Sequence, residues 1–299
     1  MQANASVSRS STDTNYLVAP QEAAESNRIG GKARALADLH EANLPVPDWV
    51  VLTPEACTDS LTDAQQKRID AGPPLDGALD ELQPSEAVRQ TLSAAAESLF
   101  DDGTPEAERR VAVRSSALDE DAAEHSFAGQ LDSYLFVPPS EVSARVADVW
   151  RSAFRESVLE YRRAQGLPVV PQPPAVLLQR MVRPDRAGVA FSADPSTGRR
   201  GVAVVSAVRG VGTALVDGDV EGDTYRVDRS GTVVDRSVRP QARATRPDPE
   251  AEDGLRWEDL DGEEGERPVL DDDEARDVAD LARRAERHFN RPQDIEWAW

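Results

Sequence analysis

Short apolar runs alternate with amphipathic stretches along this chain, and this alternation constrains the fold more than any other feature. A buried strand typically reads as a brief run rich in β-branched residues. Runs of this kind occupy 49–53, 111–113, 133–137, 175–182, 188–191 and 202–208. Helical patterns lie between several of them, notably over 33–43 and 141–165. Strands and helices are therefore both expected, in a strand, helix, strand rhythm.

The length of 299 residues suits one large domain or two packed lobes. Proline-rich residues 168–174 are typical of a linker and predict a boundary between an N-terminal lobe at 15–170 and a C-terminal lobe at 171–299. The apolar runs that begin at 175 are assigned to the second lobe. Acidic, proline-containing residues at about 236–270 predict a solvated excursion from that lobe.

The two ends of the chain carry their own signals. Residues 1–14 are polar and predict a disordered tail, without the apolar run of a signal peptide. No later stretch is long and apolar enough to cross a bilayer, so no membrane association is expected. Near the other end, Asp271 to Asp273 predict the cap of a helix that closes at Asn290, and residues 294–299 predict a strand.

The charge balance limits the kinds of partner. Lys plus Arg total 34 against 55 Asp plus Glu, a net charge of −21, which disfavours nucleic acids and anionic lipids. Lys32 and Lys67 are the two lysines, and every other basic side chain apart from histidine is arginine. This pattern suits a salt-rich cytoplasm and predicts a halophilic protein, with an ordinary acidic cytosolic protein as the alternative.

Cysteine and histidine give little support for a metal centre. Cys57 is the single cysteine, so an internal disulfide and a cysteine-rich metal site are both excluded, as suits a reducing cytoplasm. His40, His125 and His288 show no metal-ligand spacing and are interpreted as structural or surface residues.

Gly30-Gly31-Lys32 precedes a predicted helix and is the first candidate phosphate site. A helix N-terminus offers unpaired N–H groups and a favourable dipole, and the Lys32 ammonium can reach a phosphate oxygen. Glycines before a helix are more often only turn residues, so this motif alone is weak evidence.

Two further segments could contact a nucleotide. Arg114 follows the 111–113 strand and could donate two hydrogen bonds to a phosphate, or form a salt bridge with an acid at 119–121; the two interpretations are about even. Residues 126–130 could fold over a nucleotide as a glycine loop, or could simply connect to the next strand.

Asp294 and Glu296 alternate on the predicted terminal strand. Side chains two residues apart on a strand share a face, so both carboxylates could hold Mg²⁺ that bridges ATP phosphates. The alternative is an edge strand whose charges prevent aggregation.

Read together, these segments resemble the N-terminal nucleotide-binding domain shared by phosphoenolpyruvate synthase, pyruvate phosphate dikinase and rifampicin phosphotransferase. The similarity runs from about Arg28 to the end of the chain. The matching segments are IGGKARALADLHEANLPVPDWVVLT, VAVRSSALDEDAAEHSFAGQLDSYLFV, VWRSAFRESVLEYRRAQGL, VLLQRMV, AGVAFSADPSTG and HFNRPQDIEWA.

The resemblance implies an α+β, two-lobed ATP-grasp fold with mixed sheets flanked by helices and with ATP between the lobes. It also implies a role for each candidate residue. Lys32 and Arg114 act on the phosphates and are the catalytic residues; Ser126, Phe127, Ala128, Gly129 and Gln130 form the covering loop; Gln179, Met181 and Val182 approach the adenine; and Glu296, with Asp294, takes Mg²⁺.

The resemblance further implies that ATP phosphorylates a histidine on a separate domain, which carries the group to pyruvate or a drug on a third domain. We expect those domains, and a strand with a Gln and an Arg that completes the site, to be missing from this chain. Gly210-Val211-Gly212-Thr213 stands where the family has Gly-Leu-Gly-Glu, so the role of that carboxylate is open.

Three functions remain as hypotheses. The first is a pyruvate, water dikinase half-site that requires its histidine domain in trans. The second is a stand-alone nucleotide-binding or regulatory module, or an inactive remnant of a split gene. The third is half of a rifampicin-type drug phosphotransferase, which the residues cannot separate from the first because acceptor specificity lies in other domains.

Overall fold

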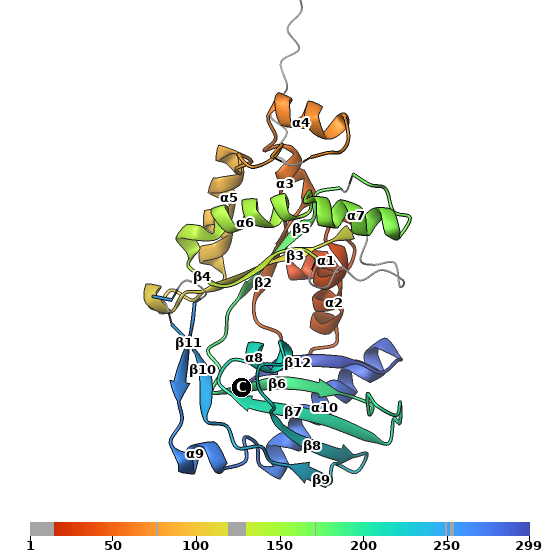
Figure 1. Cartoon of the computed structure of the whole chain (residues 1–299), viewed down its shortest axis with the longest axis vertical. Coiled ribbons are helices and arrows are strands. Elements are labelled where there is room, and N and C mark those ends of the chain that lie inside the picture. Colours follow the sequence, from red (N-terminus) through yellow and green to blue (C-terminus); the bar gives the residue numbers. More distant parts are fainter. Residues whose placement is uncertain (1–14, 76, 119–129, 171, 249, 252–253) are drawn as a thin grey trace, which may run out of the picture.

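The computed structural model describes residues 15–75, 77–118, 130–170, 172–248, 250–251 and 254–299. These residues form two five-stranded sheets and a two-stranded ribbon, with helices packed on the sheets (Figure 1). The α+β class is thereby confirmed. Every strand pair in the described sheets is antiparallel, which corrects the expectation of mixed sheets.

The first sheet has the strand order β1-β2-β5-β3-β4. Its strands are β1 (Leu17–Val18), β2 (Trp49–Leu52), β3 (Val111–Ser116), β4 (Ser133–Val137) and β5 (Ala175–Arg180). The helices and 3-10 turns around it are α1 (Pro20–Ala23), α2 (Gly30–Glu41), α3 (Pro54–Thr58), α4 (Asp63–Asp70), α5 (Glu86–Ser98), η1 (Glu106–Glu108), η3 (Pro139–Glu141), α6 (Val142–Ser152) and α7 (Glu156–Ala164).

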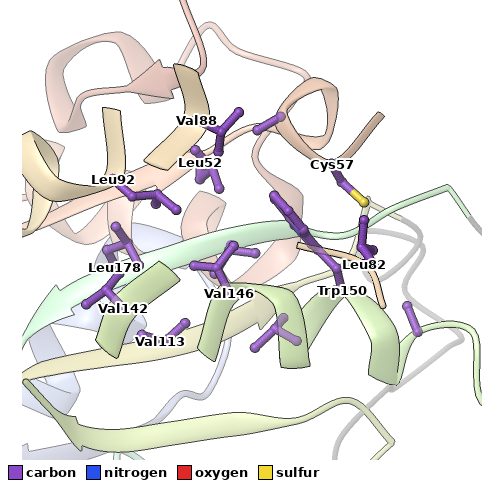
Figure 2. Close-up of a cluster of buried hydrophobic side chains, with 14 of the residues drawn as sticks. Leu52, Cys57, Leu82, Val88, Leu92, Val113, Val142, Val146, Trp150 and Leu178 are labelled. Atoms are coloured by element: carbon purple, nitrogen blue, oxygen red, sulfur yellow. The ribbon is translucent and has the colours of Figure 1, made fainter. Parts of the chain in front are cut away.

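Each face of the first sheet has its own apolar core. On one face, Ala33 and Ala37 of α2 pack with Val51 and Leu177. On the other face, α5 and α6 build a larger core in which Trp150 is fully buried. Figure 2 shows this second core, with Cys57 beside Trp150 and Leu82. The α2 face carries the candidate residues Arg114 and Gln179.

The predicted strand at 175–182 forms, but its assignment to the second lobe is wrong. β5 lies at the centre of the first sheet, where Leu178 is opposite Val50 of β2 and Val113 of β3. The local pattern could not reveal this, because sheet membership is decided by pairing with β3 and β2, which lie far from β5 in the sequence. We therefore propose a lobe boundary after Arg180 in place of one at residue 170.

The single helix predicted over 141–165 is also wrong, because the chain forms α6 and α7 with a break between them. Arg155 adopts an extended conformation, with φ of −66° and ψ of 145°. Its guanidinium donates two hydrogen bonds of 2.6 Å to Asp132, at the start of β4. An ion pair with a distant segment thus accompanies the break in a continuous amphipathic pattern.

The second sheet has the order β12-β6-β7-β8-β9. Its strands are β6 (Arg186–Phe191), β7 (Val202–Arg209), β8 (Asp223–Asp228), β9 (Val233–Ser237) and β12 (Asp294–Ala298), and β8 and β9 form a hairpin. Helix α10 (Asp272–Phe289) packs against one face, and short α8 (Thr213–Val216) lies next to β6. The predicted cap is confirmed, since Asp271 and Glu274 form a capping box.

The segment predicted as a solvated excursion is instead partly folded. It contains β10 (Arg243–Pro247), β11 (Leu255–Asp259) and α9 (Gly262–Glu266). Ala244 and Thr245 are buried. The Thr245 carbonyl accepts a 2.9 Å hydrogen bond from the N–H of Val211, which lies in the loop at 210–213 after β7. At the far end, Gly254 lies against Phe136 of β4. The ribbon therefore contacts both sheets, as Figure 1 shows.

Cys57 is expected to resist thiol reagents until the first sheet's core opens. The residue is fully buried, and burial raises the pKa of its thiol far above the usual range. Because the thiolate is the reactive form, both access and ionisation are blocked in the folded protein. We expect labelling by a chromogenic disulfide reagent to be slow in buffer and fast in denaturant. Rapid stoichiometric labelling of the folded chain would contradict this packing.

In the described part of the chain, no helix has the length and apolarity needed to cross a membrane.

Candidate nucleotide site

The N-terminus of α2 is fastened to the end of β3. Gly31 N–H donates to the carbonyl of Ala117 at 3.2 Å, and Ala33 N–H donates to Ser116 Oγ at 3.1 Å. Gly30 has φ of +69°, and a Cβ there would lie 2.2 Å from the Ser116 carbonyl oxygen. The glycine pair therefore serves first as a docking point for the helix, and the expectation that these N–H groups are unpaired is corrected for Gly31.

This docking brings Lys32 and Arg114 to the same part of the first sheet. Lys32 lies in the first turn of α2, one residue beyond the docked Gly31. Arg114 lies on β3 two residues before Ser116, and strand alternation puts both on the α2 face. Arg114 is half-buried and forms no ion pair with a described residue. The acids at 119–121, its alternative partners, lie outside the described residues.

Gln179 joins the same face from the neighbouring strand. It is directly opposite Ala112 of β3 and Trp49 of β2, and residues paired in this way project to the same side of a sheet. Arg114 is opposite Leu177, the residue two positions before Gln179, so the guanidinium and the amide are diagonal neighbours. The sequence pattern predicted a strand at or next to Arg114 and Gln179. The register between β3 and β5 brings these two residues together.

Met181 and Val182 begin the connection from the first sheet to the second. Met181 N–H donates to the carbonyl of Arg110 at 2.9 Å, which ties the connection to the start of β3. Val182 is 36% exposed. Of the predicted covering loop, Ser126, Phe127, Ala128 and Gly129 lie outside the described residues, and Gln130 is half-buried just before β4.

A small cavity lies between this connection and the ribbon. Its volume is about 20 Å³, and Arg110, Phe136, Met181 and Pro247 are among its lining residues. That is room for about one water molecule and is far too small for a nucleotide. The cavity marks the place where the ribbon, the connection and the first sheet meet.

Asp294 and Glu296 share the open face of the second sheet, as predicted. They are opposite Phe191 and Val189 of β6, and both side chains are exposed. Ile295 and Trp297, which alternate with them, pack under α10. Among the described residues, β12 is an edge strand, so the alternative of charges that protect an edge stays open.

Asp294 and Glu296 fit Mg²⁺ only if water or phosphate oxygens supply its remaining ligands. Among the residues described, no group of three or more His, Cys, Asp or Glu could enclose a metal. Mg²⁺ commonly binds one or two carboxylates and completes its shell with water and phosphate oxygens. Asp294 and Glu296 are compatible with that arrangement, in which the nucleotide itself would supply further oxygens.

The glycine loop at 210–213 occupies the junction of the second sheet and the ribbon. Gly210 has φ of +79°, and a Cβ there would lie 2.1 Å from the Thr245 carbonyl oxygen. The N–H of Gly210 donates a 2.7 Å hydrogen bond to the backbone carbonyl of Asp185, which lies in the connection between the two sheets. Thr213 begins α8, where the resemblance places a carboxylate. The loop thus links the ribbon to the connection that carries Met181.

Asp194 belongs to a matching segment, but sequence reasoning assigned it no role. It accepts hydrogen bonds from Arg226 at 2.7 Å and from Ser196 N–H at 2.9 Å. The Arg226 guanidinium, followed by the Ser196 N–H, lowers the pKa of this carboxyl. The contacts close the loop between β6 and β7. The signal that could have found this role is the Asp-Pro-Ser-Thr-Gly pattern, which is typical of a turn.

Comparisons with known proteins show the family of this chain. The model of the family "Pyruvate phosphate dikinase, AMP/ATP-binding domain" matches residues 26–299. A rifampicin phosphotransferase of Streptomyces sviceus is 36% identical over 94% of this chain and 34% of its own length. The prodigiosin synthesizing transferase PigC of Serratia marcescens is 35% identical over 92% of this chain and 30% of its own length. A probable phosphoenolpyruvate synthase of Methanocaldococcus jannaschii is 30% identical over 90% of this chain and 24% of its own length.

The chain belongs to the pyruvate phosphate dikinase AMP/ATP-binding domain family. It spans about a third or less of the length of these relatives, which are longer proteins. Members of this family include ATP-dependent phosphotransferases.

Proposed function

We propose that the chain binds ATP between the α2 face of the first sheet and the open face of the second, and that it activates a phosphoryl group for transfer. The observation that carries this proposal is the docking of α2 on the end of β3. That contact puts a lysine and an arginine on one face, beside the amide of Gln179. Two cations near one strand end suit a polyphosphate, because each can neutralise charge on its oxygens.

Each candidate residue has a separate role in binding or activating ATP. Lys32 and Arg114 bind the phosphate oxygens and stabilise the charge that develops on the leaving oxygen when a histidine nitrogen attacks the phosphorus. Gln179, Met181 and Val182 orient the base. Asp294 and Glu296 hold Mg²⁺, which would supply further neutralisation of the phosphate charge. The histidine and the final acceptor belong to other domains or chains.

For the acceptor, we propose pyruvate, because relatives over 90% of this chain include a phosphoenolpyruvate synthase of Aeropyrum pernix and probable ones of other archaea. A drug acceptor is the second candidate, favoured by the identity of 36% to a rifampicin phosphotransferase against 30% to a probable phosphoenolpyruvate synthase. A nucleotide-binding module without turnover is the third. Acceptor choice resides in parts of the relatives that this chain does not match, so ATP binding is the step to test here.

Calorimetry of Mg²⁺-ATP binding in concentrated KCl tests the nucleotide site. We expect Lys32→Ala and Arg114→Ala each to weaken binding by about 10- to 100-fold, since a hydrogen bond to a charged group contributes roughly 1.5–3 kcal/mol. Lys67→Ala and Arg89→Ala are the matched controls, because both side chains lie on other helices, α4 and α5, and are well exposed. Equal affinity of all four variants would overturn the site, and no binding by the intact chain would favour an inactive domain.

A further inference from the structure

One end of the second sheet gathers three chain reversals. β6 ends at Phe191 and β7 begins at Val202, opposite the end of β8 at Asp228. β12 begins at Asp294, which is opposite Phe191. The connections at 192–201, 229–232 and 290–293 therefore lie at the same end of the sheet. Ser192 and Gln293 exchange hydrogen bonds of 2.8 and 2.9 Å, which fasten the first connection to the third.

These connections and the last turn of α10 present a group of arginines, here called the arginine end. Its members are Arg199, Arg200, Arg229, Arg287 and Arg291. Glu286 of α10 ties two of them together, because its carboxylate lies 3.1 Å from Arg229 and 3.6 Å from Arg200. Arg229 Nε also donates to the Arg200 carbonyl at 2.6 Å. Arg200 and Arg229 thus share one surface with Glu286, and the bounds of the strands and of α10 place Arg199, Arg287 and Arg291 at the same end of the sheet.

Three of the acids at this end, Asp194, Asp228 and Glu286, are already bound within the fold. Asp228 accepts hydrogen bonds from Ser230 N–H at 2.8 Å and from Thr232 N–H at 3.0 Å, which close the β8–β9 turn. Asp194 is bound by Arg226, and the side chain of Glu286 is only 9% exposed between its two arginines. Among the described acids at this end, Asp294 remains exposed, beside the three outward-facing cations of Arg199, Arg287 and Arg291.

Three members of the arginine end are exposed and form no ion pair with any described residue: Arg199, Arg287 and Arg291. Exposed arginines elsewhere do pair, as in Arg163 with Glu156 at 2.8 Å and Arg256 with Glu258 at 2.9 Å. The chain carries 55 acids against 34 lysines and arginines, so exposed arginines that outnumber the exposed acids beside them depart from its general pattern. The dipole of α10 favours a cation at Arg287 in its last turn. It does not account for Arg199 or Arg291, which lie on the connections at 192–201 and 290–293.

We propose that the arginine end is a docking surface for an acidic protein segment. The cations lie on exposed, separate connections, so they suit several carboxylates spread over a surface. A net charge of −21 opposes the approach of a long polyanion such as nucleic acid, whereas a short acidic segment gains local attraction at smaller cost. Arg291 precedes Asp294 by three residues, so a bound segment borders the open face of the second sheet. The inference does not depend on whether the chain binds ATP.

Fluorescence anisotropy of a labelled oligoglutamate peptide tests this surface on the full chain at low and at high KCl. The test variant carries Arg199→Gln, Arg287→Gln and Arg291→Gln together. Its control carries Arg89→Gln, Arg163→Gln and Arg256→Gln, which removes the same charge from other exposed sites. We expect saturable binding that salt weakens, a loss of about tenfold in the test variant, and less than about threefold in the control.

Three results would overturn the proposal. Equal losses in the two variants would show that only the total charge matters, and an absence of saturable binding would show that no docking surface exists. Tripolyphosphate that displaces the peptide at far lower concentration than unlabelled oligoglutamate, and whose binding is lost in the test variant, would make this a small-anion site instead. The substituted side chains are exposed, so both variants are expected to melt within a few degrees of the parent chain.

Discussion

Gly30→Ala is expected to destabilise the chain by about 3–5 kcal/mol, the largest effect of any single methyl group added to the first sheet's surroundings. A left-handed φ of +69° costs a non-glycine residue about 1–2 kcal/mol. The added Cβ would also lie 2.2 Å from the backbone oxygen of Ser116, and a backbone atom in a sheet cannot rotate away as a side chain can. Relief of that contact requires the N-terminus of α2 to leave β3.

Chemical denaturation measures this loss, with Gly103→Ala as the control, because no atom lies within 4 Å of a Cβ at Gly103. The displaced helix also moves Lys32, so we expect Mg²⁺-ATP binding to weaken even where the variant remains folded. A Gly30→Ala chain with parental stability and parental ATP affinity would show that the docking of α2 does not position the site.

Asp223→Ala is expected to lower the free energy of unfolding by about 3–5 kcal/mol. The substitution removes the carboxylate that holds both ends of the segment at 239–269, which contains the ribbon, on the second sheet. Asp223 is fully buried, and its two oxygens accept from Arg239 N–H at 2.8 Å and from Val269 N–H at 2.7 Å. The hydroxyl of Tyr225 adds a third hydrogen bond at 3.1 Å. Each buried donor left without a partner costs about 1–3 kcal/mol.

Hydrogen exchange locates this effect, and thermal or chemical unfolding measures its size. We expect exchange to rise first at residues 239–247 and around Val269, which flank the two bonds. Asp219→Ala is the control. Asp219 lies four residues before Asp223, its carboxylate is exposed, and that carboxylate forms no hydrogen bond with a described residue. A uniform rise in exchange over both sheets would indicate global unfolding and would contradict a local anchoring role.

Local patterns predicted the elements that local interactions stabilise. The capping box at Asp271 and Glu274 satisfies N–H groups within one turn of α10, so a few adjacent residues suffice to specify it. The alternation of Asp294 and Glu296 likewise predicted that they share one face of β12; that Ile295 and Trp297 on the other face pack under α10 is seen in the structure. The family resemblance added the expectation of a nucleotide domain, and the family match confirms that class.

Contacts between distant residues decided the rest. The run at 175–182 is a strand in any context, but pairing with β2 and β3 places it in the first sheet. The pattern over 141–165 is helical throughout, but the break at Arg155 accompanies its ion pair with Asp132. The ribbon strands at 243–247 and 255–259 have a largely charged sequence, and they are held by backbone bonds to the loop at 210–213 and by the contact of Gly254 with Phe136.

The candidate site shows the same division. The sequence by itself determined which residue types are present, including a lysine in the first turn of a helix, an arginine on a strand and two carboxylates on one strand face. Only the tertiary structure decided that Gly30 and Gly31 fasten that helix to β3, and that the register of β5 sets Gln179 beside Arg114. The physical reason is that periodicity and capping act over a few residues, whereas strand register and backbone docking depend on free energies shared between segments far apart in the chain.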